Sequence, residues 1–391
     1  MNILICPSGF KESLEPHLAA DCIEEGILRV VPDAVIQKAP LFDGGEGFAR
    51  AIVAATDGQL KYHTVTGVVG QPIMSHYGIL GCRGGCCESK TAVVEMAAVA
   101  GLSLVPKGLR DPSHTTTFGV GEMILAAIDE GARQILVGCG DSGTSDGGVG
   151  MCQALGARFL DATGNEIPHA SGGGILSEVA SIDLSRLDPR LKDVNIEVAC
   201  NWNNVLCGPN GVARVYGPQK GATTPKQVEA LALALDNYGS VVTRKLGIDM
   251  SQTPGSGASG GLGTGLILIG AKLRPRYEVM TEYLNIDKLL DECQLVFTAE
   301  GGIDFQTPRG KIPAEIALQA KKHGLPVIAL AGTIGIDAEA NYEAGIDAFA
   351  SILQGPTTLE NAIKEVERLL KDSAESAMRM VMVGRSLRES V

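Results

Sequence analysis

The chain has 391 residues, of which 45% are hydrophobic, and its formal net charge at pH 7 is −12. A chain of this length exceeds a comfortable single core, so we expect two globular domains. The sequence shows no basic patch interleaved with aromatic residues, which argues against nucleic acid as a partner. No apolar run approaches the roughly 18 residues that span a bilayer, which argues against a membrane protein.

The amino terminus and the cysteines favour a cytoplasmic location. Residues 1–6 lack the basic region and the cleavage site of a secretory signal. The ten cysteines are irregularly spaced, and many of them, such as Cys6, Cys139 and Cys200, stand inside apolar segments. Cytosolic proteins use reduced cysteines in this way, so we expect thiols and no disulfides.

The first elements in chain order are a strand over residues 2–6, a loop over 7–11 and a helix over about 14–30. In the loop, Ser8 and Lys11 stand just past the strand end and before the helix, a position that favours phosphate or carboxylate binding. A solvated surface lysine is an equally good interpretation of Lys11.

A second strand, at about 34–39, leads into the acidic glycine loop 43–47, and a helix then runs to about residue 56. In this helix Arg50 stands four residues after Glu46. Arg50 could therefore grip a substrate carboxylate or form an intrahelical ion pair with Glu46.

The middle of the chain changes architecture. Residues 64–80 alternate with glycine turns, which predicts antiparallel hairpins. The apolar run 135–137 then leads into the loop 138–151, which holds six glycines and two aspartates. Asp141, Ser142, Thr144 and Asp146 could bind a ligand there, although Asp, Ser and Gly are also the ordinary residues of turns.

A further strand at 196–200 ends at Asn201, and the loop 216–223 carries Lys220 between glycines, a second cation for phosphate. The spacing of Gly255, Gly257 and Gly260 satisfies GxGxxG, but no strand precedes it, so we interpret it as a decoy and not as a dinucleotide-binding loop. The GxxxxGK[ST] sequence of a P-loop does not occur.

The last third alternates strands and helices regularly, beginning with a strand at about 295–298 that is followed by Glu300 and Asp304. Such alternation predicts an α/β fold with a doubly wound, mainly parallel sheet. The start of the chain shows the same alternation of strand and helix as its last third. We therefore expect one discontinuous domain from 1–65 and 285–391, with 66–284 inserted as a second α/β domain.

Three loops, at 43–47, 138–151 and 299–304, each follow an apolar run and combine glycines with carboxylates. Glycine lets backbone amides approach a ligand closely, and carboxylates hold divalent cations. A phosphorylated ligand needs both features, so the three loops suggest one shared site.

Taken together, these motifs resemble the glycerate kinase family, the type that phosphorylates glycerate with ATP and lacks a Walker loop. The resemblance covers almost the whole chain in order. It is carried by Phe10-Lys11 with Ser13-Leu14, Asp43-Gly44-Gly45-Glu46-Gly47, Val94-Glu95-Met96-Ala97, Thr116 to Glu122, Asp146-Gly147-Gly148, Phe159-Leu160-Asp161, Gly217 to Ala222, and Glu300-Gly301 with Asp304, Gln306-Thr307, Gly310-Lys311 and Pro313.

The resemblance implies two α/β domains with the site in the cleft between them. The chain departs from the family pattern at three places. Ser8 stands where the family usually has an aspartate, the Gly-Gly-Ser of the central loop reads Gly-Asp-Ser at 140–142, and Asn201 replaces an aspartate. A loop carboxylate is thus lost and another is gained nearby.

Phosphoryl transfer from ATP needs Mg²⁺ on phosphate oxygens, cations over the transferring group and a base at the attacking hydroxyl. We assign catalysis to Asp304 or Asp43 as base with Lys11 and Lys311, and Mg²⁺ binding to Asp141, Asp146 and Glu300. The predicted substrate-binding and phosphate-binding residues are Ser8, Gly44, Gly45, Arg50, Gly140, Ser142, Thr144, Asn201, Lys220 and Thr307.

Alternative functions stay open at this stage. The acceptor could be a related small hydroxy acid, or the protein could be a non-catalytic sensor of small acids. An oxidoreductase is disfavoured because no GxGxxG follows a strand. We expect 2-phosphoglycerate as the product, although the sequence does not distinguish phosphorylation of the 2-hydroxyl from that of the 3-hydroxyl. It also leaves open whether the protein is a homodimer.

Overall fold

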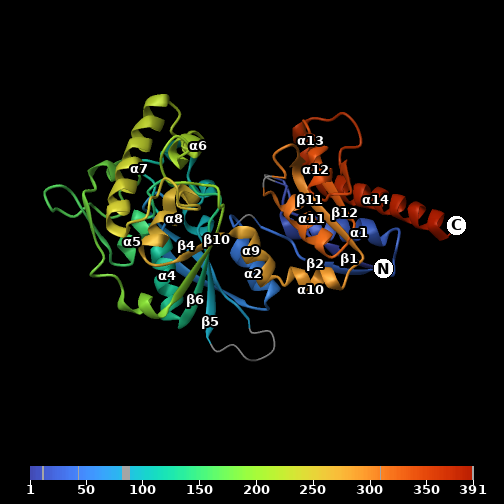
Figure 1. Ribbon diagram of the computed structural model, residues 1–391, viewed down its shortest axis with the longest axis horizontal. Helices are drawn as coiled ribbons and strands as arrows, with labels where there is room; N and C mark the ends of the chain where they lie inside the picture. Colours follow the sequence, from blue (N-terminus) through green and yellow to red (C-terminus); the bar gives the residue numbers. More distant parts are fainter. Residues whose placement is uncertain (11–12, 43, 82–88, 309, 390–391) are drawn as a thin grey trace. The chain divides into compact units, whose positions relative to one another are not determined.

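The computed structural model describes residues 1–10, 13–42, 44–81, 89–308 and 310–389 (Figure 1). The chain divides into two compact units: Met1–Phe42 together with Met280–Val391, and Asp43–Val279. The first unit therefore combines the two ends of the chain.

The boundaries differ from the expected 65 and 285. Helix α2 (Phe48–Ala55) and strand β3 (Gln59–Thr66) belong to the second unit. The reason is a tertiary one, because β3 pairs along its whole length with β4 (Pro72–Ile79) of that unit.

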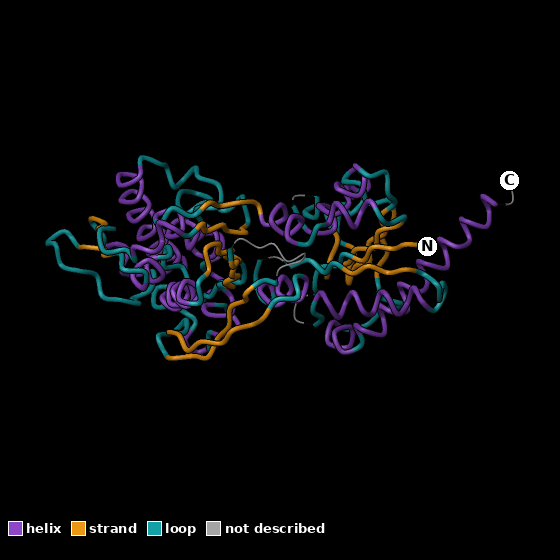
Figure 2. The backbone as a smooth tube through the Cα atoms, turned by 90° about the horizontal axis from the view of Figure 1, so that it is seen from below, coloured by secondary structure: helices purple, strands orange, loops and turns teal. Residues whose placement is uncertain are grey.

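The first unit contains a five-stranded sheet in the order β13-β12-β11-β1-β2, in which every pair of neighbours is parallel. Helices lie on both sides of these strands (Figure 2). This arrangement is the expected doubly wound α/β fold. The strands are β1 (Asn2–Ile5), β2 (Val35–Lys38), β11 (Leu295–Ile303), β12 (Val327–Ile334) and β13 (Ala348–Ser351).

Alternate residues of the buried strands face opposite sides of this sheet. Ile3, Ile5 and Phe297 pack in one core cluster with residues of helices α1 and α14. The helices of this unit are α1 (Pro16–Leu28), α10 (Ile286–Asp291), α11 (Ile312–Lys322), α12 (Ala340–Glu343), α13 (Leu359–Lys364) and α14 (Val366–Glu389), and α9 (Arg276–Tyr283) spans the boundary.

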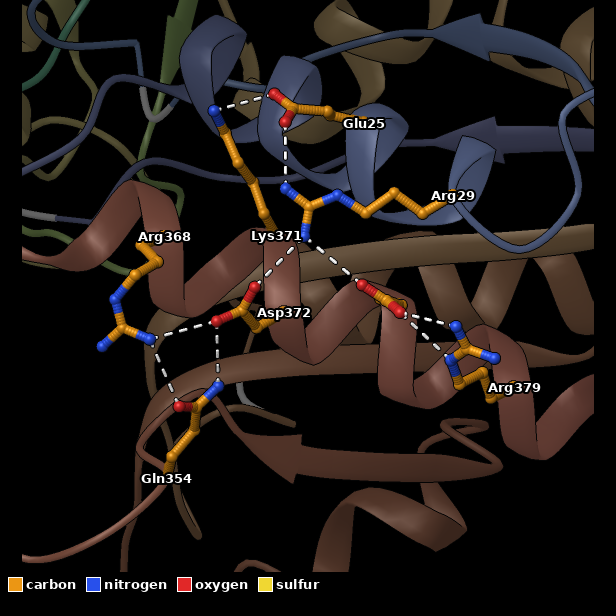
Figure 3. A network of polar contacts seen from close by, with 8 residues as sticks. Glu25, Arg29, Gln354, Arg368, Lys371, Asp372 and Arg379 are labelled. Carbon is orange, nitrogen blue, oxygen red and sulfur yellow. Dashed lines mark hydrogen bonds and ion pairs between the residues drawn. The ribbon is translucent and has the colours of Figure 1, made fainter.

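Helices α1 and α14 pack closely because Gly26 has no side chain. A Cβ added at Gly26 would lie 2.3 Å from the Lys371 carbonyl oxygen. At the rim of this contact Arg29 reaches from α1 to Asp372 and Glu375 of α14, at 3.2 and 3.3 Å (Figure 3). The first and last long helices of the chain are thereby joined in one layer.

The second unit contains a six-stranded sheet in the order β10-β9-β6-β5-β4-β3. Strands β10, β9, β6 and β5 are parallel, and β5, β4 and β3 are antiparallel, which confirms the predicted hairpin. The strands not yet given are β5 (Lys90–Glu95), β6 (Ala132–Gly138), β9 (Asn195–Cys200), β10 (Lys272–Pro275), and a separate pair, β7 (Arg158–Leu160) and β8 (Ser181–Asp183).

Helices pack on this sheet around one large apolar cluster. The longest of them begins with a capping box, in which the Thr224 hydroxyl accepts the Gln227 N–H and the Gln227 side chain bonds the Thr224 backbone. The remaining helices are α3 (Ala97–Ala100), α4 (Phe118–Asp129), α5 (Val149–Ala154), α6 (Val212–Tyr216), α7 (Pro225–Leu246) and α8 (Ala258–Leu268). Within the described ranges, no helix has the length and apolar character needed to cross a membrane.

Candidate active site

The carboxyl edge of the first unit's sheet has a topological switch point between β1 and β11. From β1 the chain proceeds to β2 on one side, and from β11 it proceeds to β12 and β13 on the other. Open α/β sheets bind ligands where the strand order diverges in this way. Ser8 lies here, and its backbone N–H and its hydroxyl both donate to the Ala299 carbonyl, at 2.8 and 3.1 Å.

A lysine stands between two carboxylates beside this point. The Nζ of Lys311 lies 3.8 Å from Oε2 of Glu300 and 3.6 Å from Oδ1 of Asp304, and it donates to the Gly302 carbonyl at 3.3 Å. The three side chains are 30%, 21% and 31% exposed, respectively. Partial exposure and long ion pairs distinguish these groups from a closed interior network.

The loop that carries Asp304 is fixed by its neighbours. The backbone N–H of Asp304 donates to the Thr307 hydroxyl at 3.1 Å, and the Asp304 carbonyl accepts from the Asn341 amide at 3.0 Å. Both Thr307 and Asn341 are fully buried. Asn341 was absent from the sequence prediction, because a lone asparagine in a polar segment carries no signal of its role.

In the second unit, two of the three acidic glycine loops come together at the carboxyl ends of β6 and β9. A Cβ added at Gly44 would lie 3.2 Å from the Cys139 carbonyl oxygen, and one at Gly140 would lie 2.5 Å from the Gly45 nitrogen. Only glycine permits this approach. Asp141, at φ 44°, accepts the Glu46 N–H at 3.2 Å and so links the loops. The third loop, at 299–304, belongs to the first unit.

A buried carboxylate stabilises the end of the loop 43–47 and the start of helix α2. Glu95, at the end of β5, accepts the N–H groups of Gly47 and Ala49 at 3.1 and 2.9 Å, and thus caps the first turn of α2. Burial raises the pKa of Glu95 to about 7, although these two hydrogen bonds act in the opposite direction. This geometry makes Glu95 an acid at a helix start and not an exposed ligand group.

The carboxylate of Asp146 is buried and fully hydrogen-bonded. Its carboxylate is 1% exposed and accepts hydrogen bonds from the backbone and hydroxyl of Thr117 and from the N–H groups of Gly148 and Gly150, at 2.7–3.3 Å. Burial raises the pKa of this group. Both oxygens accept hydrogen bonds, and this arrangement favours a structural role for Asp146, holding α4 and α5 together, over the expected role as a metal ligand.

Lys220 is likewise an interior residue. It is 3% exposed, and its ammonium donates to the Ser142 hydroxyl at 2.7 Å and to the Thr144 carbonyl at 2.6 Å. Burial lowers the pKa of Lys220 to about 7. The lysine therefore binds the loop 140–144 from inside, which favours a structural role over the expected one as a cation on phosphate.

The glycine-rich segment 255–265 packs on the same loop. A Cβ added at Gly260, whose φ is 72°, would lie 2.0 Å from the Thr144 carbonyl oxygen, and the Gly260 carbonyl accepts the Gly147 N–H at 3.1 Å. These glycines serve close packing of two backbones. Their role agrees with the interpretation of the GxGxxG spacing as a decoy.

The other predicted residues occupy varied positions. Arg50 is exposed on α2, and Asn201 is half-buried and accepts the Asn203 N–H at 3.1 Å. The Glu46 carboxylate accepts the Ser103 hydroxyl. Lys11 and Asp43 lie outside the described residues, so their assigned roles stay predictions.

The described residues could bind Mg²⁺ only together with the substrate, because the phosphates would have to supply some of the metal's ligands. Among them, no three histidine, cysteine or acidic side chains form a cluster able to hold a metal. Mg²⁺ usually takes one or two protein carboxylates and fills its remaining positions with water and substrate phosphates. Glu300, beside Lys311 and partly exposed, fits this requirement.

Comparisons with known proteins agree with these features. The profile of the Glycerate kinase family matches residues 3–382. Glycerate 2-kinase of Escherichia coli K12 is 44% identical over 93% of both chains, and the glycerate kinase of Bacillus subtilis 168 is 44% identical over 96% of this chain and 97% of its own. The crystal structure of a candidate glycerate kinase 2 from Salmonella typhimurium LT2 is 42% identical and superposes with a TM-score of 0.82 over 99% of each chain. The chain therefore belongs to the glycerate kinase family.

Proposed function

We propose that this protein transfers the γ-phosphate of ATP to the 2-hydroxyl of glycerate, giving 2-phosphoglycerate and ADP. The observation that carries the proposal is the placement of Lys311 between Glu300 and Asp304, beside the switch point of a parallel sheet. The family supports a kinase. The name of the E. coli relative, a glycerate 2-kinase, supports the 2-hydroxyl.

Asp304 is the proposed base. Its carboxylate is partly exposed, while the loop that bears it is fixed through Thr307 and Asn341. It accepts the proton of the attacking hydroxyl as the new bond to the γ-phosphorus forms and the bond to the β,γ-bridging oxygen breaks. Rigid backbone support is what a positioned base needs.

Lys311 is the proposed electrophilic group. Its ammonium neutralises charge on the transferring phosphoryl group, and its pairing with the two carboxylates keeps it oriented before substrate binds. Glu300 is the proposed ligand of Mg²⁺, and the predicted metal-binding role of Asp141 stays a proposal. When bound, the ion shields the negative charge of the ATP phosphates.

The second unit contributes binding groups in this proposal. The close-packed glycines Gly44, Gly45 and Gly140 would bring backbone groups near phosphate, and the exposed Arg50 would pair with the glycerate carboxylate. The predicted substrate-binding and phosphate-binding roles of Ser8, Ser142, Thr144, Asn201 and Thr307 stay part of this proposal. We also infer a cytoplasmic location, since the cysteines that the structure describes are all free thiols.

The direct test is ATP consumption by the purified protein with D-glycerate and Mg²⁺, with the product identified by phosphorus NMR. Formation of 2-phosphoglycerate is the expected result. Formation of 3-phosphoglycerate would correct the hydroxyl group, and turnover with only another small hydroxy acid would correct the substrate. An absence of turnover with every acceptor would contradict the proposal.

A further inference from the structure

We propose that Lys220 is a positioning residue, which holds the loop 140–144 in the shape that binds ATP and does not itself touch the nucleotide. The contacts of its ammonium carry this inference. Two of its three donors are already used, by the Ser142 hydroxyl and the Thr144 carbonyl, and the side chain is 3% exposed. For ATP binding, the inference rests on the proposed function.

The local sequence explains how a lysine comes to point inward. Lys220 ends a short 3-10 turn, Pro218–Lys220, and Gly221 follows at φ 116°. A Cβ added at Gly221 would lie 1.9 Å from the Arg110 carbonyl oxygen. Only glycine fits there, so the chain reverses tightly and the preceding lysine is directed into the unit.

The loop that Lys220 holds is also fixed on its other side. The Leu102 N–H donates to the Asp141 carbonyl, and the Gly143 N–H donates to the Ala100 carbonyl, both at 2.8 Å. Backbone bonds therefore fix the loop along α3. Two buried side chains hold it from the interior: Lys220, and Thr115, whose hydroxyl donates to the Gly143 carbonyl at 2.9 Å. Asp141 then stands between these attachments with its carboxylate on the Glu46 N–H.

A buried ammonium is expensive to desolvate, which makes a purely incidental lysine at this position unfavourable. Asp146 offsets part of that penalty, because its carboxylate favours the charged form of Lys220 through space. The amino group that holds the loop thus lies in the field of a buried carboxylate. Removing the ammonium leaves the Thr144 carbonyl without its donor and loosens the loop.

The test compares Lys220→Met with Lys226→Met, a matched control on the exposed first turn of α7. In steady-state kinetics we expect the KM for ATP to rise about tenfold in K220M, with the KM for glycerate within about twofold. K226M should match the wild type. A purely structural role would lower kcat with the folded fraction and leave both KM values unchanged, and that result would overturn the proposal.

Hydrogen exchange followed by mass spectrometry supplies a readout that needs no turnover. K220M should exchange at least about tenfold faster in peptides that cover 140–146 and should be unchanged in peptides that cover 295–303. If K220M does not fold, K220Q, which keeps an N–H donor, takes its place with a smaller expected change. Unchanged exchange at 140–146 in the folded variant would refute the positioning role, even if the wild type proves inactive on glycerate.

Discussion

Lysine, carboxylate and glycine residues meet both around the end of β11 and around the loop after β6, yet the two regions use them in opposite ways. Around β11, Lys311, Glu300 and Asp304 are partly exposed and joined by ion pairs of 3.6–3.8 Å. After β6, Asp146 and Lys220 are buried and fully engaged in hydrogen bonds of 2.6–3.3 Å. Satisfied buried groups build architecture, whereas exposed and loosely paired groups remain available for chemistry.

The largest effect should come from Lys311→Met. Removing the ammonium deletes the cation proposed to stabilise the transferring phosphoryl group, so kcat should fall about 10²- to 10³-fold. The melting temperature should change by only a few degrees, because Lys311 is partly exposed. Lys322→Met, in the exposed last turn of α11, the helix that Lys311 precedes, is the control. Wild-type kcat in K311M would remove the distinction between the two loops.

The converse substitution in the second unit is Asp146→Ala. It leaves the buried N–H groups of Thr117, Gly148 and Gly150 without their acceptor, and we expect a loss of about 3 kcal/mol or more in the free energy of unfolding. Urea unfolding measures this, with the exposed Asp193→Ala as control. Equal stabilities of D146A and D193A would show that the buried loop is not architectural.

Glu95 should give the second unit a pH dependence. Its folded pKa is about 7 against an ordinary value of 4.5, so its contribution to stability is fully present below pH 4.5 and is lost as pH rises through 7. The difference of 2.5 corresponds to about 3 kcal/mol. We measure the free energy of unfolding in urea between pH 4.5 and 8. As pH increases, this free energy should fall more steeply, or rise less, in the wild type than in Glu95→Gln. Parallel curves would contradict the raised pKa.

The smallest effect is expected on the surface of the first unit. Arg29→Met removes the contacts with Glu25 and Asp372 shown in Figure 3, and also the contact with Glu375; the Arg29 side chain is 39% exposed. Exposed ion pairs contribute little, so the melting temperature should shift by no more than about 3 °C and kcat should not change. A larger shift would mean that this network, and not the apolar contact around Gly26, joins α1 to α14.

Much of the fold was predictable because its signals are local. The apolar runs before glycine loops gave β1, β6 and β11, and the turn residues gave the hairpin of β3 and β4. The boundary near residue 42 was not predictable, since the assignment of α2 depends on which strands pair far along the chain.

The candidate site was predictable in residue type but not in burial. Asp141 and Asp146 stand five residues apart in one glycine loop, and the sequence treats them alike, yet one is exposed and the other is enclosed by Thr117 and two glycine amides. Lys220 stands between glycines, and the sequence likewise does not show whether its side chain is exposed or buried. Burial of such groups is a property of the packed unit, and a single sequence carries no period or spacing that reports it.

The most direct test of the account is the rate of product formation by Asp304→Asn, followed by phosphorus NMR with ATP, Mg²⁺ and D-glycerate. Asn preserves the shape of the side chain but cannot accept the proton of the attacking hydroxyl, so we predict at least about 10²-fold slower formation of 2-phosphoglycerate than in the wild type. The exposed Asp33→Asn serves as control and should match the wild type. Formation of 2-phosphoglycerate by D304N at the wild-type rate would contradict the assignment of the reaction to this cluster.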